Sequence, residues 1–325
     1  MDQMLAMSGA QTKDPYPKAR DSGTFETRRE ALLVFKTVSA IAVLLGSILS
    51  QGWAQASPYQ VLSTNKVGGD GGYDYVYADV DGRNLYVPRT GAQGRIAVYN
   101  LDTLSPVGII PGINDGILYD AFDNSVYIFS HKVPHLTKID AESGAVTGTL
   151  NLGGAPEQAV SDGNGNLYVD LEDKDVIARI DGGTLKVTGQ FGLEGRGGTC
   201  AGLAMDPANH ILFAACRNPQ TMVILSAANG KVLDSLAIGS GCDGASFDQQ
   251  TGEVFSSQRD GTLSVIHEDS PTSFRLEQTV TTMRGAKTHA LDTKTNRVFL
   301  IAALPGLLPM TTASETFTVL EVGRP

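Results

Sequence analysis

Acidic residues, a lysine and a histidine recur at one place in a repeated pattern of the sequence. Six times, an Asp or Ser precedes an aromatic residue by seven positions, and the charged residues lie a few positions before that Asp or Ser. If the repeats surround a common axis, these residues meet although they are far apart in the chain. Such a group could bind a cation, a metal ion or a small polar ligand with both signs of charge. The residues are Asp74, Asp115, Glu157, Asp243, Lys287 and His289.

The same residues allow a simpler interpretation. Neighbouring carboxylates repel one another unless something positive joins them, and Lys287 could supply that charge from within the protein. The group would then be an internal charge network at a wet channel and would require no ligand. We expect no resident cofactor, and we leave a divalent metal at the channel mouth as the alternative.

The repeated pattern predicts the fold that must position these residues. Its aromatic residues recur at intervals of 41, 41, 45, 42 and 44 residues, each after a Leu or Val. A period in the low forties, filled with short alternating strands between Gly, Asn and Asp, is typical of a β-propeller with one blade per repeat. The six pairs are Asp79/Tyr86, Asp120/Tyr127, Ser161/Tyr168, Asp206/Phe213, Asp248/Phe255 and Asp292/Phe299.

Each repeat is expected to form a four-stranded blade. The first strand ends at the Asp or Ser, whose oxygen can accept a hydrogen bond from the backbone N–H two residues on. The second strand carries the aromatic residue, which we expect to pack between neighbouring blades. Counting back five positions from the Asp or Ser reaches the start of the innermost strand, at the central channel. The loops between second and third strands open on the same face and carry charges that we interpret as solvated: Arg89, His131, Lys132, Asp170, Glu172, Arg217 and Arg259.

The two ends of the repeat region complement each other. The last repeat ends with a third strand, Thr316–Val322, and has no fourth, whereas Tyr59–Val67 is a strand without a blade of its own. We expect Tyr59–Val67 to complete the last blade, which would remove both unpaired sheet edges. The sequence therefore predicts an all-β protein with one domain over residues 57–325, a six-bladed propeller closed by its N-terminal strand.

Residues 1–56 have the composition of a leader and signal peptide. Arg28 and Arg29 precede the apolar stretch Val38–Leu49, which is followed by the small-x-small sequence Ala54–Ala56. This order predicts cleavage before Ser57 and a periplasmic or secreted protein. An uncleaved membrane anchor is disfavoured, because a spanning helix needs about 20 apolar residues.

The export route stays open between general secretion and the twin-arginine pathway, whose signal Thr27–Leu33 loosely resembles. Without residues 1–56, the chain keeps 19 basic and 30 acidic residues, a net charge of −11. Such a charge repels nucleic acids and anionic membranes. We therefore expect an unidentified small ligand or protein as partner, no nucleic acid, no membrane after cleavage, and a monomer.

The three cysteines all follow the predicted cleavage site. If Leu203 faces Phe213, the same register puts Cys200, at the start of one strand, opposite Cys216, at the end of the next. A disulfide between them is expected in an oxidising compartment. Cys242 takes the place of Cys200 in the following repeat and is a rival partner. Three buried thiols are the remaining alternative.

Enzyme signatures are missing from the sequence. It contains no Gly-x-Ser-x-Gly nucleophile elbow, no His-Glu-x-x-His zinc motif and no Cys-x-x-Cys-His haem motif. We therefore predict no catalytic residue from the sequence. The apolar insertion Leu304–Met310 in the last repeat could cap the ring or form a contact patch.

Six segments carry a resemblance to a known family. They are Gly72–Tyr75, Gly153–Pro156, Asp162–Val169, Gly202–Pro207, Cys216–Asn218 and Asp260–Ser270. These segments resemble the bacterial β-propeller proteins with YVTN repeats (the YncE-like family), and the likeness covers nearly all of residues 59–325. The resemblance implies a secreted or periplasmic propeller, generally of seven blades, whose members mostly lack an assigned activity. This chain departs from it in showing only six repeats, as if one early blade were absent.

Two classes of function stay open. One is a periplasmic or secreted scaffold that holds a small ligand or a protein at the channel mouth or the loops around it, which requires only a surface. The other is a metal-assisted lactonase or esterase at the channel mouth, by analogy with six-bladed lactonases. That enzyme would need converging carboxylates with room for a metal-bound water. Because a shared fold alone is weak support for an enzyme, the scaffold is favoured.

Overall fold

The computed structural model describes residues 58–69, 72–90, 94–111, 116–303 and 317–325. These residues lie within one compact unit, Ala56–Pro325. Three features of the sequence fall outside the described residues: the leader with its cleavage site, Asp115, and the insertion Leu304–Met310. Among the residues that the structure describes, no helix has the length and apolar character needed to cross a membrane.

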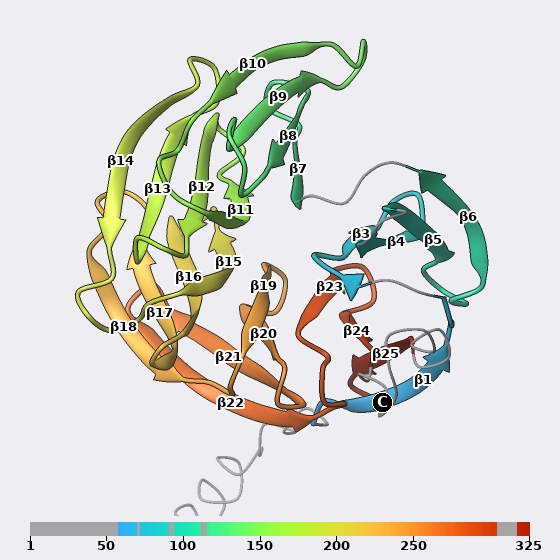
Figure 1. Ribbon diagram of the computed structural model, residues 1–325. Coiled ribbons are helices and arrows are strands. Elements are labelled where there is room, and N and C mark those ends of the chain that lie inside the picture. Colours follow the sequence, from blue (N-terminus) through green and yellow to red (C-terminus); the bar gives the residue numbers. More distant parts are fainter. Residues whose placement is uncertain (1–57, 70–71, 91–93, 112–115, 304–316) are drawn as a thin grey trace, which may run out of the picture. The chain divides into compact units, whose positions relative to one another are not determined.

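Six antiparallel sheets surround a central channel and form the blades of a β-propeller (Figure 1). Blades 1 and 2 contain β2 (Gly72–Tyr73), β3 (Tyr77–Asp79), β4 (Asn84–Thr90), β5 (Arg95–Asn100) and β6 (Pro106–Pro111), then β7 (Gly116–Asp120), β8 (Ser125–Phe129), β9 (Leu136–Asp140) and β10 (Val146–Leu150). Blades 3 and 4 contain β11 (Pro156–Ser161), β12 (Asn166–Leu171), β13 (Val176–Asp181) and β14 (Lys186–Gly192), then β15 (Cys200–Asp206), β16 (Ile211–Arg217), β17 (Gln220–Ser226) and β18 (Val232–Ala237). Blades 5 and 6 contain β19 (Cys242–Asp248), β20 (Glu253–Gln258), β21 (Thr262–Ser270) and β22 (Ser273–Thr281), then β23 (Thr288–Asp292), β24 (Arg297–Ala302), β25 (Thr318–Gly323) and β1 (Gln60–Lys66). The predicted six-bladed, all-β fold is confirmed.

The N-terminal strand completes the last blade, as predicted. Strand β1 pairs antiparallel with β25, so that the sheet order is β1-β25-β24-β23. Tyr59, just before β1, packs edge-on against Phe255 of blade 5, with ring centroids 5.3 Å apart. Its hydroxyl donates to Glu253 at 2.7 Å and accepts from Arg324 at 3.0 Å. The two ends of the domain are therefore joined by a strand pair and a buried polar cluster.

Side-chain oxygens at the ends of the innermost strands fix the turns that follow. In five repeats, the Asp or Ser accepts a hydrogen bond from the backbone N–H two residues on, at 2.8–3.1 Å. These residues are Asp120, Ser161, Asp206, Asp248 and Asp292. Asp79 of blade 1 instead reaches the N–H of Gly82, three residues on, at 2.8 Å.

The aromatic residue of the repeat packs between neighbouring blades at five of the six junctions. These five side chains are at most 3% exposed, and each lies in a buried cluster with residues of the following blade. They are Tyr127, Tyr168, Phe213, Phe255 and Phe299. The sixth, Tyr86 of blade 1, is only half-buried and belongs to none of these clusters.

The register between β15 and β16 differs from the predicted one along most of its length. Phe213 faces Ala204 rather than Leu203, because a bulge between Cys200 and Gly202 shifts the pairing by one residue. The same bulge brings Cys200 opposite Cys216, and a disulfide joins them with Cα atoms 3.8 Å apart. Cys242 is a buried free thiol.

Candidate functional site

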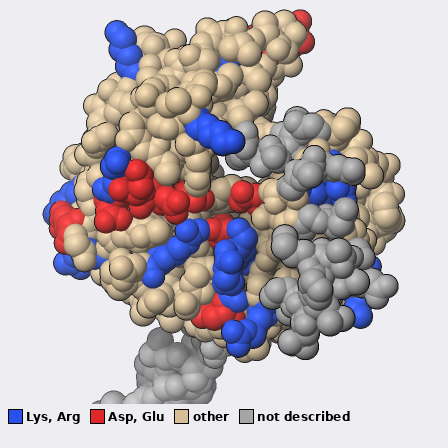
Figure 2. All heavy atoms as spheres, viewed as in Figure 1, with Lys and Arg blue, Asp and Glu red and all other residues tan. Residues whose placement is uncertain are grey.

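A cavity of about 530 Å³ lies at the channel mouth, where the innermost strands begin. Its walls come from the starts of β11 and β19, the residue before β23, and the loops between second and third strands. Four of the residues singled out in the sequence line it: Asp74, Glu157, Asp243 and Lys287. Acidic and basic side chains lie next to one another in the middle of this face (Figure 2).

Asp243 is the centre of an ion-pair network in this cavity. Its carboxylate is nearly buried and accepts hydrogen bonds from both Arg217 and Lys287. Arg217, at the end of β16, also donates to Glu172 at 3.0 Å and to the backbone carbonyl of Cys242 at 2.9 Å. Lys287 thus supplies a positive charge inside the group, as the simpler interpretation required. Arg217 does so too, and it is not the solvated charge that the sequence suggested.

Glu157 stands on the other side of the cavity, beside a buried tyrosine. It accepts a hydrogen bond from Tyr75, whose hydroxyl also lies 2.8 Å from the carbonyl oxygen of Ala201. Burial raises the pKa of Glu157 to about 7, and the nearby carboxylates of Asp243 and Glu172 act in the same direction. Its charge therefore changes near neutral pH, and a cation in the cavity would favour the ionised form.

Asp170 on β12 is a buried carboxyl without a hydrogen-bond partner among the described residues. Burial raises its pKa well above the usual range, and the charge of Glu157 adds to this effect. From the sequence, we interpret Asp170 as a solvated loop charge. This interpretation is wrong, because β12 extends through Leu171 and Asp170 therefore lies inside the sheet.

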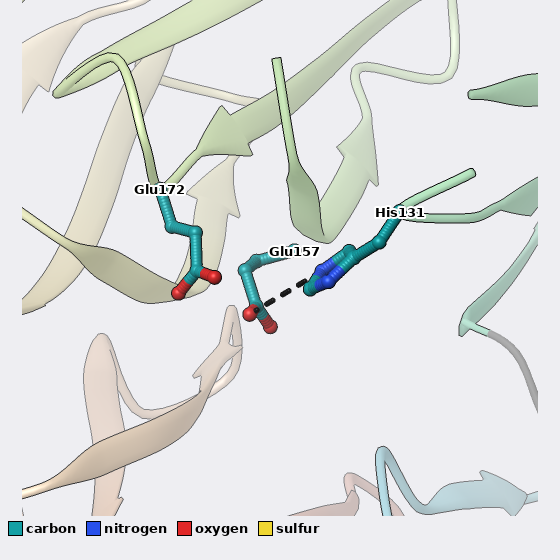
Figure 3. A group of neighbouring side chains, drawn as sticks. All are labelled: His131, Glu157 and Glu172. Atoms are coloured by element: carbon teal, nitrogen blue, oxygen red, sulfur yellow. Dashed lines mark ion pairs between the residues drawn. The ribbon is translucent and has the colours of Figure 1, made fainter. Parts of the chain in front are cut away.

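Three side chains from separate segments converge in a way that could hold a metal ion. His131 follows β8, Glu157 lies on β11 and Glu172 follows β12; one ligand atom from each lies within 4.8 Å of the others (Figure 3). The Nε2 atom of His131 is 3.6 Å from a carboxylate oxygen of Glu157. One imidazole and two carboxylates can bind several divalent ions. The repeat period pointed to Glu157 alone, because the other two lie in loops outside the repeated strand positions.

Charges of both signs also face the cavity without an ion pair among the described residues. Asp74 is acidic, and Lys132 and Arg259 are basic. Burial raises the pKa of Asp74, and its carboxylate accepts a hydrogen bond from the backbone N–H of Tyr75 at 3.0 Å. The cavity therefore offers a carboxylate to a positive group of a ligand and two cationic side chains to a negative group.

His289 does not line the cavity with the other predicted residues. It lies within β23, is 6% exposed, and both ring nitrogens are 2.8 Å from serine hydroxyls, Ser246 and Ser257. Ser257 donates its own proton to the carbonyl of Lys287 at 2.7 Å, so it accepts from His289 Nδ1–H. Burial lowers the pKa of His289 to about 3 and keeps the ring neutral.

Comparison with known proteins supports the fold and leaves the activity open. No family model matches the sequence, and no curated protein matches it. Among solved structures, a chain of the "Crystal Structure of Mitotic Checkpoint Complex" is similar, with a TM-score of 0.61 and 11% identity. The match covers 85% of this chain and 95% of that one. At such low identity, the likeness concerns the propeller fold alone.

Proposed function

We propose that this protein is an exported binding scaffold whose channel mouth holds a small polar ligand with both signs of charge. The observation that carries the proposal is the set of charges that line one cavity without an ion pair among the described residues: Asp74 from blade 1, Lys132 from blade 2 and Arg259 from blade 5. A volume of about 530 Å³ suits a small molecule. The neighbouring network of Arg217, Lys287, Asp243 and Glu172 balances two positive with two negative charges and would hold the walls in place.

Export to the periplasm or the medium belongs to the same proposal. It is supported by the signal-like composition of residues 1–56 and by the resemblance to the YncE-like propellers. The net charge of −11 beyond residue 56 argues against nucleic acid as the partner. A protein bound at the same face is the other form of scaffold, and the similar solved propeller comes from a structure of a complex.

Calorimetric titration with matched small molecules tests the proposal. Free amino acids carry both charges, their amides lack the carboxylate, and their N-acetyl derivatives lack the ammonium group. We expect at least one amino acid to bind, and to lose roughly tenfold in affinity when either charge is removed. Arg259→Gln and Asp74→Asn should weaken binding similarly, whereas Lys186→Gln, on the exposed start of β14, should not. Equal binding of zwitterion and amide would contradict the proposal.

Metal-assisted hydrolysis is a second candidate, favoured by the convergence of His131, Glu157 and Glu172. A divalent ion held by these three groups could activate a water molecule toward an ester or lactone. Titration with zinc, manganese, calcium and magnesium, followed by a lactone assay, tests it. Binding that survives the double change Glu157→Gln with Glu172→Gln would exclude this site.

A further inference from the structure

The junction between blades 1 and 2 lacks the packing that the repeat provides elsewhere. At the five other junctions the aromatic residue of the second strand is buried against the next blade. Tyr86 of β4 holds this position in blade 1, yet it lines an open cavity of about 600 Å³ between β4 and blade 2. Blades 1 and 2 stand apart at this junction (Figure 1). We name this cavity the seam.

The seam is apolar and rich in aromatic rings. Tyr77 and Tyr86 line it from blade 1, with ring centroids 6.2 Å apart, and Tyr119 lines it from blade 2. Ile110 and Ile117 add aliphatic surface from the two sides. Large apolar side chains are far from buried here: Tyr77 is 58%, Tyr119 48%, Ile117 44% and Ile110 41% exposed. A ligand that covered them would gain the stabilisation that the other junctions obtain from blade packing.

The charge of the seam selects one class of ligand. Among the described residues, its lining contains two carboxylates, Asp79 and Glu157, and no lysine, arginine or histidine. Faces of tyrosine rings attract cations, and carboxylates do so more strongly. These carboxylates would repel an anionic ligand, and a neutral apolar ligand would gain no ion pair from them.

We infer that the seam is a second binding site, for an organic cation with an apolar body, such as an aryl- or alkylammonium ion. The apolar body covers Tyr86, Ile110 and Ile117, and the ammonium group contacts the tyrosine rings and a carboxylate. This site goes beyond the channel-mouth function, although Tyr75, Phe129 and Glu157 border both cavities. Its volume lies within the range of small-molecule sites.

Three naphthyl compounds of one shape test the charge requirement. They are 1-naphthylmethylammonium, the neutral 1-naphthalenemethanol and the anionic 1-naphthaleneacetate, titrated calorimetrically into the chain beginning at Ser57. The cation should bind roughly tenfold more tightly than the alcohol, and the anion should not bind. Equal affinities for cation and alcohol, or no binding at millimolar concentration, would overturn the inference.

Variants locate the binding in the seam and separate it from the channel mouth. Tyr86→Ala should weaken cation binding about tenfold. Ile117→Lys places a like charge at an exposed seam position, so it should abolish cation binding and weaken binding of the alcohol much less, through lost apolar contact alone. Phe122→Ala removes an aromatic ring that is 61% exposed and lies outside the seam, and should change nothing. Arg259→Gln, which acts on the channel mouth, should also leave cation binding intact.

Two further results would overturn the inference, one by showing another occupant of the seam and one by placing the ligand outside it. Light scattering that finds a dimer, split by Ile117→Lys, would assign the seam to a second copy of the chain and overturn the ligand site. Cation binding that persists in both Tyr86→Ala and Ile117→Lys, with wild-type circular dichroism and melting, would place the ligand elsewhere and overturn it equally.

Discussion

At the scale of single residues, the period of the repeat located the cavity but not the contacts inside it. Asp74, Glu157, Asp243 and Lys287 line the channel mouth because equivalent strand positions meet around a common axis. The period did not predict that Arg217 pairs with Asp243, because this contact depends on the direction of the Arg217 side chain at the end of its strand. Whether the four residues bind a ligand stays a prediction.

Charge neutralisation around Asp243 leads to a stability prediction. Asp243→Asn leaves Arg217 and Lys287 close together without their shared carboxylate. We expect a loss of about 2 kcal/mol in the free energy of unfolding, below the value for a fully buried pair because both cations are partly exposed. Denaturant unfolding measures it. Asp269→Asn, which removes an exposed pair with Arg275, is the control and should cost less than about 0.5 kcal/mol.

Neutral His289 makes the fold sensitive to acid. Its pKa falls from 6.5 to about 3 on burial, so between these pH values His289 is protonated in the unfolded chain and neutral in the folded chain. Stability is complete above pH 6.5 and declines below it by about 1.4 kcal/mol per pH unit until the pH approaches 3. In His289→Gln, which has no proton to gain, this part of the slope should vanish. Parallel unfolding curves of wild type and variant between pH 7 and 5 would contradict the assignment.

At the scale of elements, the blades were predictable because their signals are local. An Asp or Ser that fixes a turn and an aromatic residue seven positions later recur in each repeat, and each signal has a physical role in the structure. Register was less predictable. The bulge near Gly202 shifts β15 against β16 by one residue, and residue types do not encode such a shift. His289 shows the same limit, since its ring lies between the hydroxyls of Ser246 and Ser257 and does not line the cavity.

The closing strand should determine the stability of the whole propeller. Removing residues 57–67 deletes β1, exposes the edge of β25 and removes Tyr59 from its contacts with Phe255, Glu253 and Arg324. We expect a loss of several kcal/mol, seen as a drop of roughly 10 °C in the melting temperature. If the deletion variant had the same melting temperature as the chain beginning at Ser57, closure by β1 would not matter for stability.

At the scale of the whole molecule, blade number and closure followed from the sequence, whereas the open seam did not. The number of repeats does not predict whether blades 1 and 2 pack against each other, because their packing depends on the angle between them. The signal-like leader and the cysteines bear on a separate question, the compartment in which the protein folds. A disulfide is stable where the surroundings are oxidising, as they are outside the cytoplasm.

Thiol counting tests export and cysteine pairing together. Protein recovered from the periplasm or the medium should begin at or near Ser57 and carry a Cys200–Cys216 disulfide. Burial raises the pKa of the Cys242 thiol to about 12, so the folded protein should not react with iodoacetamide at pH 8. After denaturation without a reductant, one thiol per chain should be alkylated, and peptide mass spectrometry should locate it at Cys242. Three reactive thiols would indicate a reducing compartment, and a Cys200–Cys242 link would mean that the bulge in β15 is misplaced. Three reactive thiols, or an intact chain of 325 residues held in the membrane, would contradict the proposed export, whereas a Cys200–Cys242 link would contradict only the cysteine pairing.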